Sequence, residues 1–143
     1  MTFLVAFDGG DLAAAALRTA AELADFRDVD VLVVSIIPDD STYAIRAGWV
    51  DDEAEFDPTQ VKTMLRDRVH DIAPDARFRS ETVHAYASHN TIAKRVKHIA
   101  RDEDVGVVFI GSDNAGRFTA PVSSVGDKVS SSDEYDVYIV RTE

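Results

Sequence analysis

The chain opens with a short apolar run followed by an amphipathic segment. The run TFLVAF (2–7) is almost continuously apolar, which is typical of a parallel strand buried on both faces. From Asp11 onward, apolar side chains recur every three or four residues, and most of them are alanine, the residue with the highest helix propensity. The pattern therefore predicts a strand at 2–7 and a helix that packs on the resulting sheet.

The same alternation continues through the middle of the chain. DVDVLVVSII (28–37) predicts a second strand that ends before Pro38, and ARFRSETVHAYA (76–87) alternates well enough to predict a third. Between them, Asp57 and Pro58 have the residue types of a helix N-cap and first helical position, so a helix is expected from there to near Pro74.

The last third predicts two more strands and two more helices. Ser88 is the expected cap of a helix that continues to residues 101–104, VGVVFI (105–110) is the most apolar strand, a short helix is expected at 121–129, and YDVYIVR (135–141) is the terminal strand. Alternating strands and helices of these lengths require right-handed crossovers. The expected fold is α/β, a three-layer α/β/α sandwich around a five-stranded parallel sheet.

Residues 39–57 do not fit this alternation. They contain seven carboxylates and scattered aromatic side chains without a clear period, which predicts a long loop or lid. The aromatic side chains at Tyr43, Trp49 and Phe56 have two interpretations: they cover a ligand, or they pack on the flank of the domain or on a partner subunit. The second interpretation is favoured.

Length and composition limit the classes of protein to consider. With 143 residues, of which 45% are hydrophobic, the chain is expected to form a single domain, 1–143. It has no cysteine, which excludes disulfides, thiolate metal sites and cysteine nucleophiles. No run approaches the roughly 20 apolar residues of a membrane span, and no basic region precedes the first apolar run, so a soluble cytoplasmic protein is expected.

The charge balance is strongly acidic. The formal net charge is -11, with 26 Asp and Glu against 15 Lys and Arg. Such a surface repels phosphate backbones and anionic lipids, so neither nucleic acid nor a membrane is an expected partner. The 19 aspartates and only 4 lysines are typical of halophilic proteins, in which concentrated cations screen self-repulsion; an ordinary acidic protein is the alternative.

Two glycine-containing loops mark the place for a ligand site. DGGD (8–11) follows the first predicted strand and GSDNAG (111–116) follows the fourth. In an open parallel sheet, ligands bind beyond the carboxyl ends of the strands where strand order reverses. Glycine allows close approach to a ligand, and helix N-termini present backbone amides, so we expect these two loops to meet at one edge and to accommodate an anion.

Several stretches together give the chain a family resemblance. VAFDGG (5–10), VFIGS (108–112), SSVGDKV (123–129) and VYIVR (137–141) occur in the order and spacing of the universal stress protein family, which the chain resembles over essentially its whole length. The resemblance implies a flavodoxin-like or Rossmann-like sandwich of the adenine nucleotide alpha hydrolase type, with strand order 3-2-1-4-5. It also implies a homodimer formed through the last strand, 135–141, and a stress-response role. The alternative to the dimer is a monomer in which residues 39–57 cover the edge of the sheet.

The resemblance further implies residues for a nucleotide site. Members that bind ATP use an Asp after the first strand, main-chain atoms at the end of the second, and a glycine motif spaced G-x2-G-x9-G-[ST]. Asp8, followed by Gly9 and Gly10, corresponds to the first feature, Ile36 and Ile37 to the second, and Gly111 to the first glycine of the third.

Beyond Gly111 the chain departs from the family motif. Asn114 stands three residues later, the nearest glycine is Gly116, and Ser123 and Ser124 stand at the later Gly-Ser, while Asp113 adds a negative charge. These differences argue against ordinary ATP binding. Hydrogen-bond donors remain, however, so the loop is still a candidate site for a smaller nucleotide or anion: Ser112, Asn114, Arg117, Ser123 and Ser124.

Three functions follow from these observations. The first is a dimeric regulatory module that binds a small ligand, with ATP, ADP or AMP as the candidate cofactor. The second is a weak ATP hydrolase or nucleotide-processing enzyme, and the third a ligand-free structural dimer. No catalytic set is recognised, and His84, His89 and His98 are interpreted as surface side chains rather than a metal site. An ATP pyrophosphatase loop and a response-regulator phosphorylation site both lack essential residues.

Overall fold

The computed structural model describes residues 1–86, 89–117 and 135–143, and for His89 and Arg117 it describes the backbone alone. Along the chain the elements are β1 (Thr2–Ala6), α1 (Asp11–Arg27), β2 (Asp30–Pro38), α2 (Ser41–Arg46), η1 (Glu53–Glu55), α3 (Pro58–Ile72), β3 (Arg77–Val83), α4 (His89–Asp102), β4 (Val105–Gly111), η2 (Ala115–Arg117) and β5 (Asp136–Val140). The predicted cap at Ser88 and the predicted helix at 121–129 lie outside the described residues.

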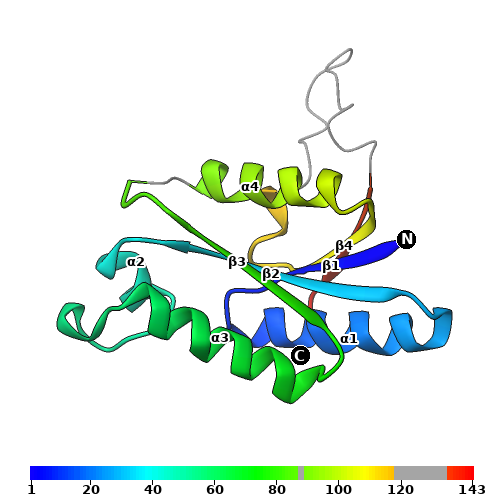
Figure 1. Cartoon of the computed structure of the whole chain (residues 1–143), viewed down its shortest axis with the longest axis horizontal. Coiled ribbons are helices and arrows are strands. Elements are labelled where there is room, and N and C mark those ends of the chain that lie inside the picture. The colour runs from blue at the N-terminus through cyan, green and yellow to red at the C-terminus, as the bar shows by residue number, and fades with distance from the viewer. Residues whose placement is uncertain (87–88, 118–134) are drawn as a thin grey trace, which may run out of the picture.

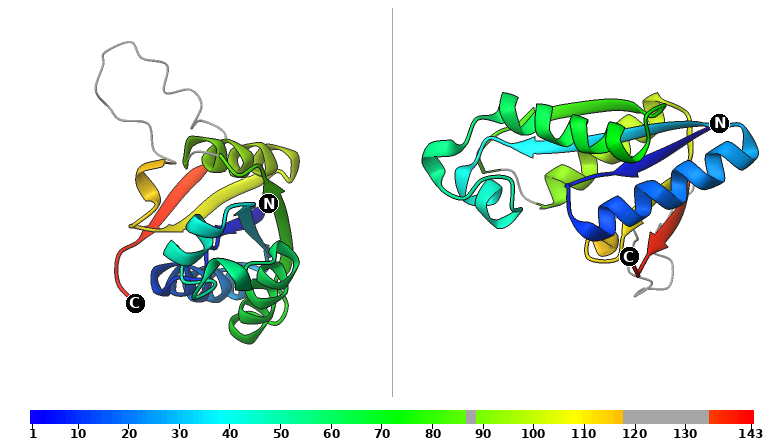
Figure 2. Two further views of the ribbon diagram at one scale, coloured as in Figure 1. Left: turned by 90° about the vertical axis from the view of Figure 1, so that its left-hand side faces the viewer. Right: turned by 90° about the horizontal axis from the view of Figure 1, so that it is seen from below.

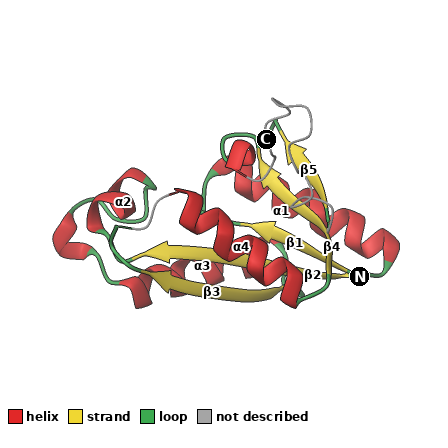
Figure 3. Cartoon of the chain, turned by 90° about the horizontal axis from the view of Figure 1, so that it is seen from above, coloured by secondary structure: helices red, strands yellow, loops and turns green. Residues whose placement is uncertain are grey.

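The strands form a five-stranded sheet in the order β3-β2-β1-β4-β5. All four strand pairings are parallel. Helices α1 and α3 cover one face of the sheet and α4 lies on the other, as Figure 1 shows from the side and Figure 3 from above. The fold class and the strand order expected from the sequence are confirmed.

The apolar runs of the central strands alternate between the two faces. In β1, Phe3 and Val5 belong to the core beneath α1 and α3, whereas Leu4 belongs to the core beneath α4. Because successive side chains of a strand point to opposite faces, a strand covered by helices on both sides must be apolar at every position. This is the reason that the sequence of β1 shows no polar alternation.

Helix α1 packs closely because its buried face is mostly alanine. Ala13, Ala16 and Ala20 are among its seven buried residues, and the small side chains let the helix approach β1 and β4. Figure 2 shows α1 running along the underside of the sheet from the end of β1. The predicted start of α3 is also confirmed, since the Asp57 carboxylate accepts a hydrogen bond from Thr59 N and Pro58 is the first helical residue.

Two sequence predictions need correction. The third strand was expected over 76–87 but ends at Val83, which pairs with Pro38, the last residue of β2. Since β3 is an edge strand with β2 as its sheet neighbour, the ladder ends there, and Ala85 is exposed.

The expected long loop at 39–57 contains α2 and η1. Asp40 begins α2 by accepting hydrogen bonds from Thr42 N and Tyr43 N, and one and a half turns are too short to show a helical period.

Within the described residues, no helix has the length and apolar character required to cross a bilayer.

Candidate functional site

The two glycine-containing loops meet at one edge of the sheet, as the sequence predicts. Asn114, after β4, donates a hydrogen bond from Nδ2 to Asp8 Oδ2 at 3.1 Å, although 106 positions separate the two residues. The parallel pairing of β1 with β4 explains the contact, because it brings the carboxyl ends of both strands to the same edge. Asp8 and Asn114 are both half-buried.

The Asp8 loop has a defined local geometry. The other carboxylate oxygen of Asp8, Oδ1, accepts a hydrogen bond from Gly10 N at 2.8 Å, which closes an Asx turn at the start of α1. Between them, Gly9 has φ +87°, a conformation that strains residues with a side chain. Gly10 of this loop and Asn114 of the other loop therefore hold the Asp8 carboxylate in place, each through a hydrogen bond to one of its oxygens.

An apolar depression, here called the inner pocket, lies beside Asp8 and Asn114. Its lining comes from the ends of β1, β2 and β4, from α2 and from α4, with a volume of about 50 Å³: Ala6, Phe7, Asp8, Val34, Ile36, Tyr43, Ile92, Val96, Ile110 and Asn114. This volume is below the 300–1,000 Å³ typical of small-molecule pockets. The described residues therefore form a small recess with an apolar wall and the polar groups of Asp8 and Asn114 beside it.

The predicted pair Ile36 and Ile37 divides between the two faces of the sheet. Ile36 lines the inner pocket, whereas Ile37 is fully buried in the core beneath α1 and α3. The alternation of side chains along β2 requires this division. The side chain of Ile37 is therefore excluded from the pocket.

Gly111 allows close packing rather than an unusual backbone conformation. A Cβ placed on Gly111 would lie 2.8 Å from Leu12 Cβ and 3.2 Å from the Leu12 carbonyl carbon. Real carbon contacts are near 3.5–4.0 Å, so a side chain here would push the end of β4 away from the first turn of α1. The glycine thus keeps the two loops together.

Three backbone amides in the two loops already have hydrogen-bond partners. Gly10 N donates to Asp8 Oδ1, Ser112 N donates to Val140 O at 2.8 Å, and Asn114 N donates to Gly111 O at 3.0 Å. An anion would have to displace these bonds to use the amides. These three bonds concern the loops themselves, whereas the expected free amides belong to the N-termini of the helices that follow the loops, and that expectation stays a prediction. Gly116 is exposed, while Ser123, Ser124 and the Arg117 side chain lie outside the described residues.

The aromatic residues of 39–57 pack against the domain's own core, as the favoured interpretation expects: Trp49 is buried in the core beneath α1 and α3, and Tyr43 and Phe56 pack against it. Trp49 and Tyr43 also lie next to the candidate site. Trp49 is buried and donates a hydrogen bond from Nε1 to Asp8 O at 2.7 Å. Its ring lies 5.4 Å from that of Tyr43, which lines the inner pocket. This segment has no periodic pattern of apolar residues, and the one signal in it was the tryptophan N–H, a donor that needs a partner when buried.

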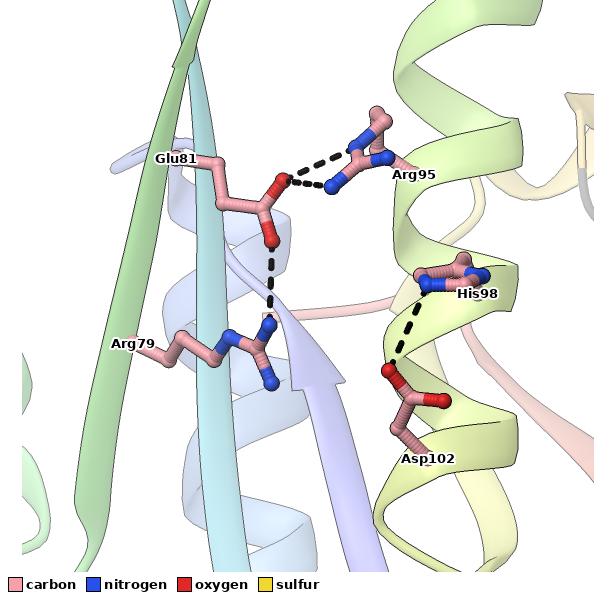
Figure 4. Close-up of polar contacts among 5 residues, drawn as sticks. All are labelled: Arg79, Glu81, Arg95, His98 and Asp102. Carbon is pink, nitrogen blue, oxygen red and sulfur yellow. Dashed lines mark hydrogen bonds and ion pairs between the residues drawn. The ribbon is translucent and has the colours of Figure 1, made fainter.

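A charged network fixes the other wall of the pocket. Glu81 on β3 accepts hydrogen bonds from Arg95 Nε at 2.8 Å and from Arg79 Nη2 at 3.2 Å, as Figure 4 shows. Glu81 pairs with Ile36 in the sheet, and Arg95 directly precedes Val96 on α4. The network therefore links α4 to β3, the neighbour of the strand β2 that carries Ile36, and so ties together two elements that border the pocket.

The described histidines do not form a metal site. His98 lies 3.3 Å from the Asp102 carboxylate one turn along α4 (Figure 4), and His84 Nδ1 accepts a hydrogen bond from Tyr86 N. The part of the chain that the structure describes contains no group of three metal-ligating side chains.

The chain was compared with protein families, with curated proteins and with solved structures. A model of the universal stress protein family matches residues 1–141. A search of curated proteins finds no match.

Solved structures resemble the chain over its whole length at low sequence identity. A universal stress protein from Archaeoglobus fulgidus in complex with dAMP is 19% identical, with 99% of this chain and 98% of that chain covered and a TM-score of 0.57. UspA from Lactobacillus plantarum is 18% identical, with coverage of 99% and 97% and a TM-score of 0.56. A universal stress protein in complex with cAMP is 20% identical, with coverage of 100% and 98% and a TM-score of 0.55.

Proposed function

The chain belongs to the universal stress protein family, and from this premise we propose that it is a regulatory module that binds an adenine nucleotide in the inner pocket. The observation that carries the proposal is the hydrogen bond between Asp8 and Asn114 at the rim of an apolar pocket. A carboxylate suits ribose hydroxyls as an acceptor, and the walls formed by Ile36, Ile92 and Val96 suit a base. Two of the similar structures contain dAMP and cAMP, which agrees with a nucleoside monophosphate as ligand.

A monophosphate is a better candidate than ATP. The amides of Gly10, Ser112 and Asn114 already have hydrogen-bond partners. The exposed carboxylate of Asp113 lies two residues after the end of β4. A triphosphate needs several donors and brings more negative charge next to Asp113. AMP needs fewer hydrogen-bond donors and brings less negative charge.

Calorimetric titration with AMP, ADP and ATP tests this proposal. The expected result is saturable binding of AMP, at least as tight as that of ATP. Asp8→Asn should weaken AMP binding about tenfold or more, because it removes a charged acceptor. Asp25→Asn makes the same change in charge at an exposed position near the other end of α1 and should leave the affinity unchanged. Equal affinities of the Asp8→Asn variant and the parent protein would refute the assignment of Asp8.

We also propose that the module is a cytoplasmic homodimer that pairs through β5. The strand is at the edge of the sheet, and Tyr138 on it is 44% exposed although its ring stacks on Phe109 with centroids 5.0 Å apart. An edge of this kind pairs readily with another chain. Sedimentation should give twice the chain mass for the parent protein and a lower mass for Tyr138→Lys; a monomeric parent would contradict the proposal.

A further inference from the structure

A second concavity, here called the outer groove, lies between residues 49–57 and the first half of α3. Its volume is about 820 Å³, within the range of small-molecule sites. Figure 1 shows the segment between α2 and α3 at one end of the molecule, beside α3. The lining residues of the outer groove and of the inner pocket do not overlap, so the two are separate places.

Seven of the ten residues that line the outer groove have apolar side chains. Among them, Trp49 is buried, and Phe56 and Met64 are half-buried. The polar atom of the tryptophan, Nε1, is bonded to Asp8 O, which fixes the ring and leaves its carbon surface as part of the groove. Such a surface accepts an aromatic or aliphatic group.

The charged side chains that line the outer groove are all negative. Glu55 and Asp57 line it, and the ten lining residues include no lysine, arginine or histidine. Residues 51–57 carry five carboxylates and no positive charge. Asp57 Oδ1 accepts a hydrogen bond from Thr59 N and Glu55 Oε2 accepts one from Asp51 N, so both carboxylates are held by the backbone near the groove.

Apolar walls with carboxylates at the rim match one chemical class of ligand. An organic cation with an apolar body gains burial of that body against Phe56 and Met64, together with attraction of its charge to Glu55 and to the face of an aromatic ring. An anion would be repelled by the carboxylates, and a neutral molecule would lack the electrostatic contribution to the binding free energy. We propose that the outer groove is a binding site for a small organic cation, such as an arylalkyl ammonium ion.

The groove and the inner pocket have adjoining walls. Trp49, which lines the groove, packs against Tyr43, which lines the inner pocket. Trp49 is also the only tryptophan in the chain. Its fluorescence therefore reports directly on occupancy of the groove.

Titration of tryptophan fluorescence with phenethylammonium chloride tests the proposal, at constant ionic strength and with 2-phenylethanol as the uncharged analogue. For a ligand of this size, a saturable change with a dissociation constant on the order of millimolar is expected. The alcohol should bind at least about threefold more weakly, because it lacks the attraction to the carboxylates.

Two variants locate the binding in the groove. Gln60→Lys adds a positive charge at an exposed position that lines the groove, and Glu55→Gln removes a negative one; each should weaken phenethylammonium binding about threefold or more. Asp67→Asn makes the same change in charge at an exposed position of α3 outside the groove and should have no effect. Circular dichroism verifies that all three variants are folded.

Three results would overturn the proposal: no saturable fluorescence change, equal affinity for the ammonium ion and the alcohol, or undiminished binding to Gln60→Lys. Displacement of phenethylammonium by AMP would place the cation in the inner pocket and would also overturn it. The groove does not depend on nucleotide binding, so the titration remains decisive if AMP fails to bind.

Discussion

Replacement of Gly111 by alanine tests why a glycine stands at the end of β4. The new Cβ would lie 2.8 Å from Leu12 Cβ and 3.2 Å from the Leu12 carbonyl carbon. Asp113 Oδ1, also at 2.8 Å, belongs to an exposed side chain that can rotate away, whereas the Leu12 backbone cannot move without shifting α1. Overpacking of this kind costs about 1–3 kcal/mol, which for a chain of 143 residues lowers the melting temperature by about 3–10 °C.

Gly116→Ala is the matched control for this substitution. Among the described residues, no atom lies within 4 Å of a Cβ at Gly116, and Gly116 has no positive φ. The control should therefore be neutral, or slightly stabilising because alanine restricts the unfolded chain. Thermal unfolding of the parent and both variants in one buffer measures the difference. Melting temperatures of Gly111→Ala and Gly116→Ala within about 1 °C of each other would refute the packing argument.

Three further substitutions or changes of condition have definite expected outcomes. Trp49→Phe keeps an aromatic ring but leaves Asp8 O without its 2.7 Å donor, so urea unfolding should show a loss of about 1–2 kcal/mol. Leu65→Ala opens a cavity at a fully buried position of α3 and should cost about 3 kcal/mol in the same assay. Lowering NaCl from about 1 M to about 0.1 M lengthens the Debye screening distance from about 3 to about 10 Å. With a net charge of -11, the melting temperature should then fall by several degrees; a constant value would contradict the halophilic interpretation.

The elements that the sequence located well are those with a strong local pattern. The alternation of core faces along Phe3, Leu4 and Val5 follows from the period of a strand, and the cap at Asp57 follows from the chemistry of a helix start. The ends of elements were less accurate. The third strand stops at Val83 because β2 has no further residue to pair with it, a fact about the neighbouring strand that the local sequence does not contain.

The candidate site shows the same limit. Asp8 and the loop after Gly111 were identified from the chain, but the sequence did not indicate that Asn114 is the residue that reaches Asp8. It also did not show that Gly10, Ser112 and Asn114 already use their amides. Hydrogen-bond partners depend on distances of a few tenths of an ångström, which residue types do not specify.

The sequence by itself determined the alternation of strands and helices and the edge of the sheet where the two loops meet, because periodicity and the handedness of parallel crossovers are set by local sterics. The tertiary structure alone decided that Trp49 and Tyr43 lie beside Asp8, although Trp49 is 41 residues away from Asp8 along the chain. That segment has no period of its own, so its position depends on where its buried side chains find partners in the folded protein.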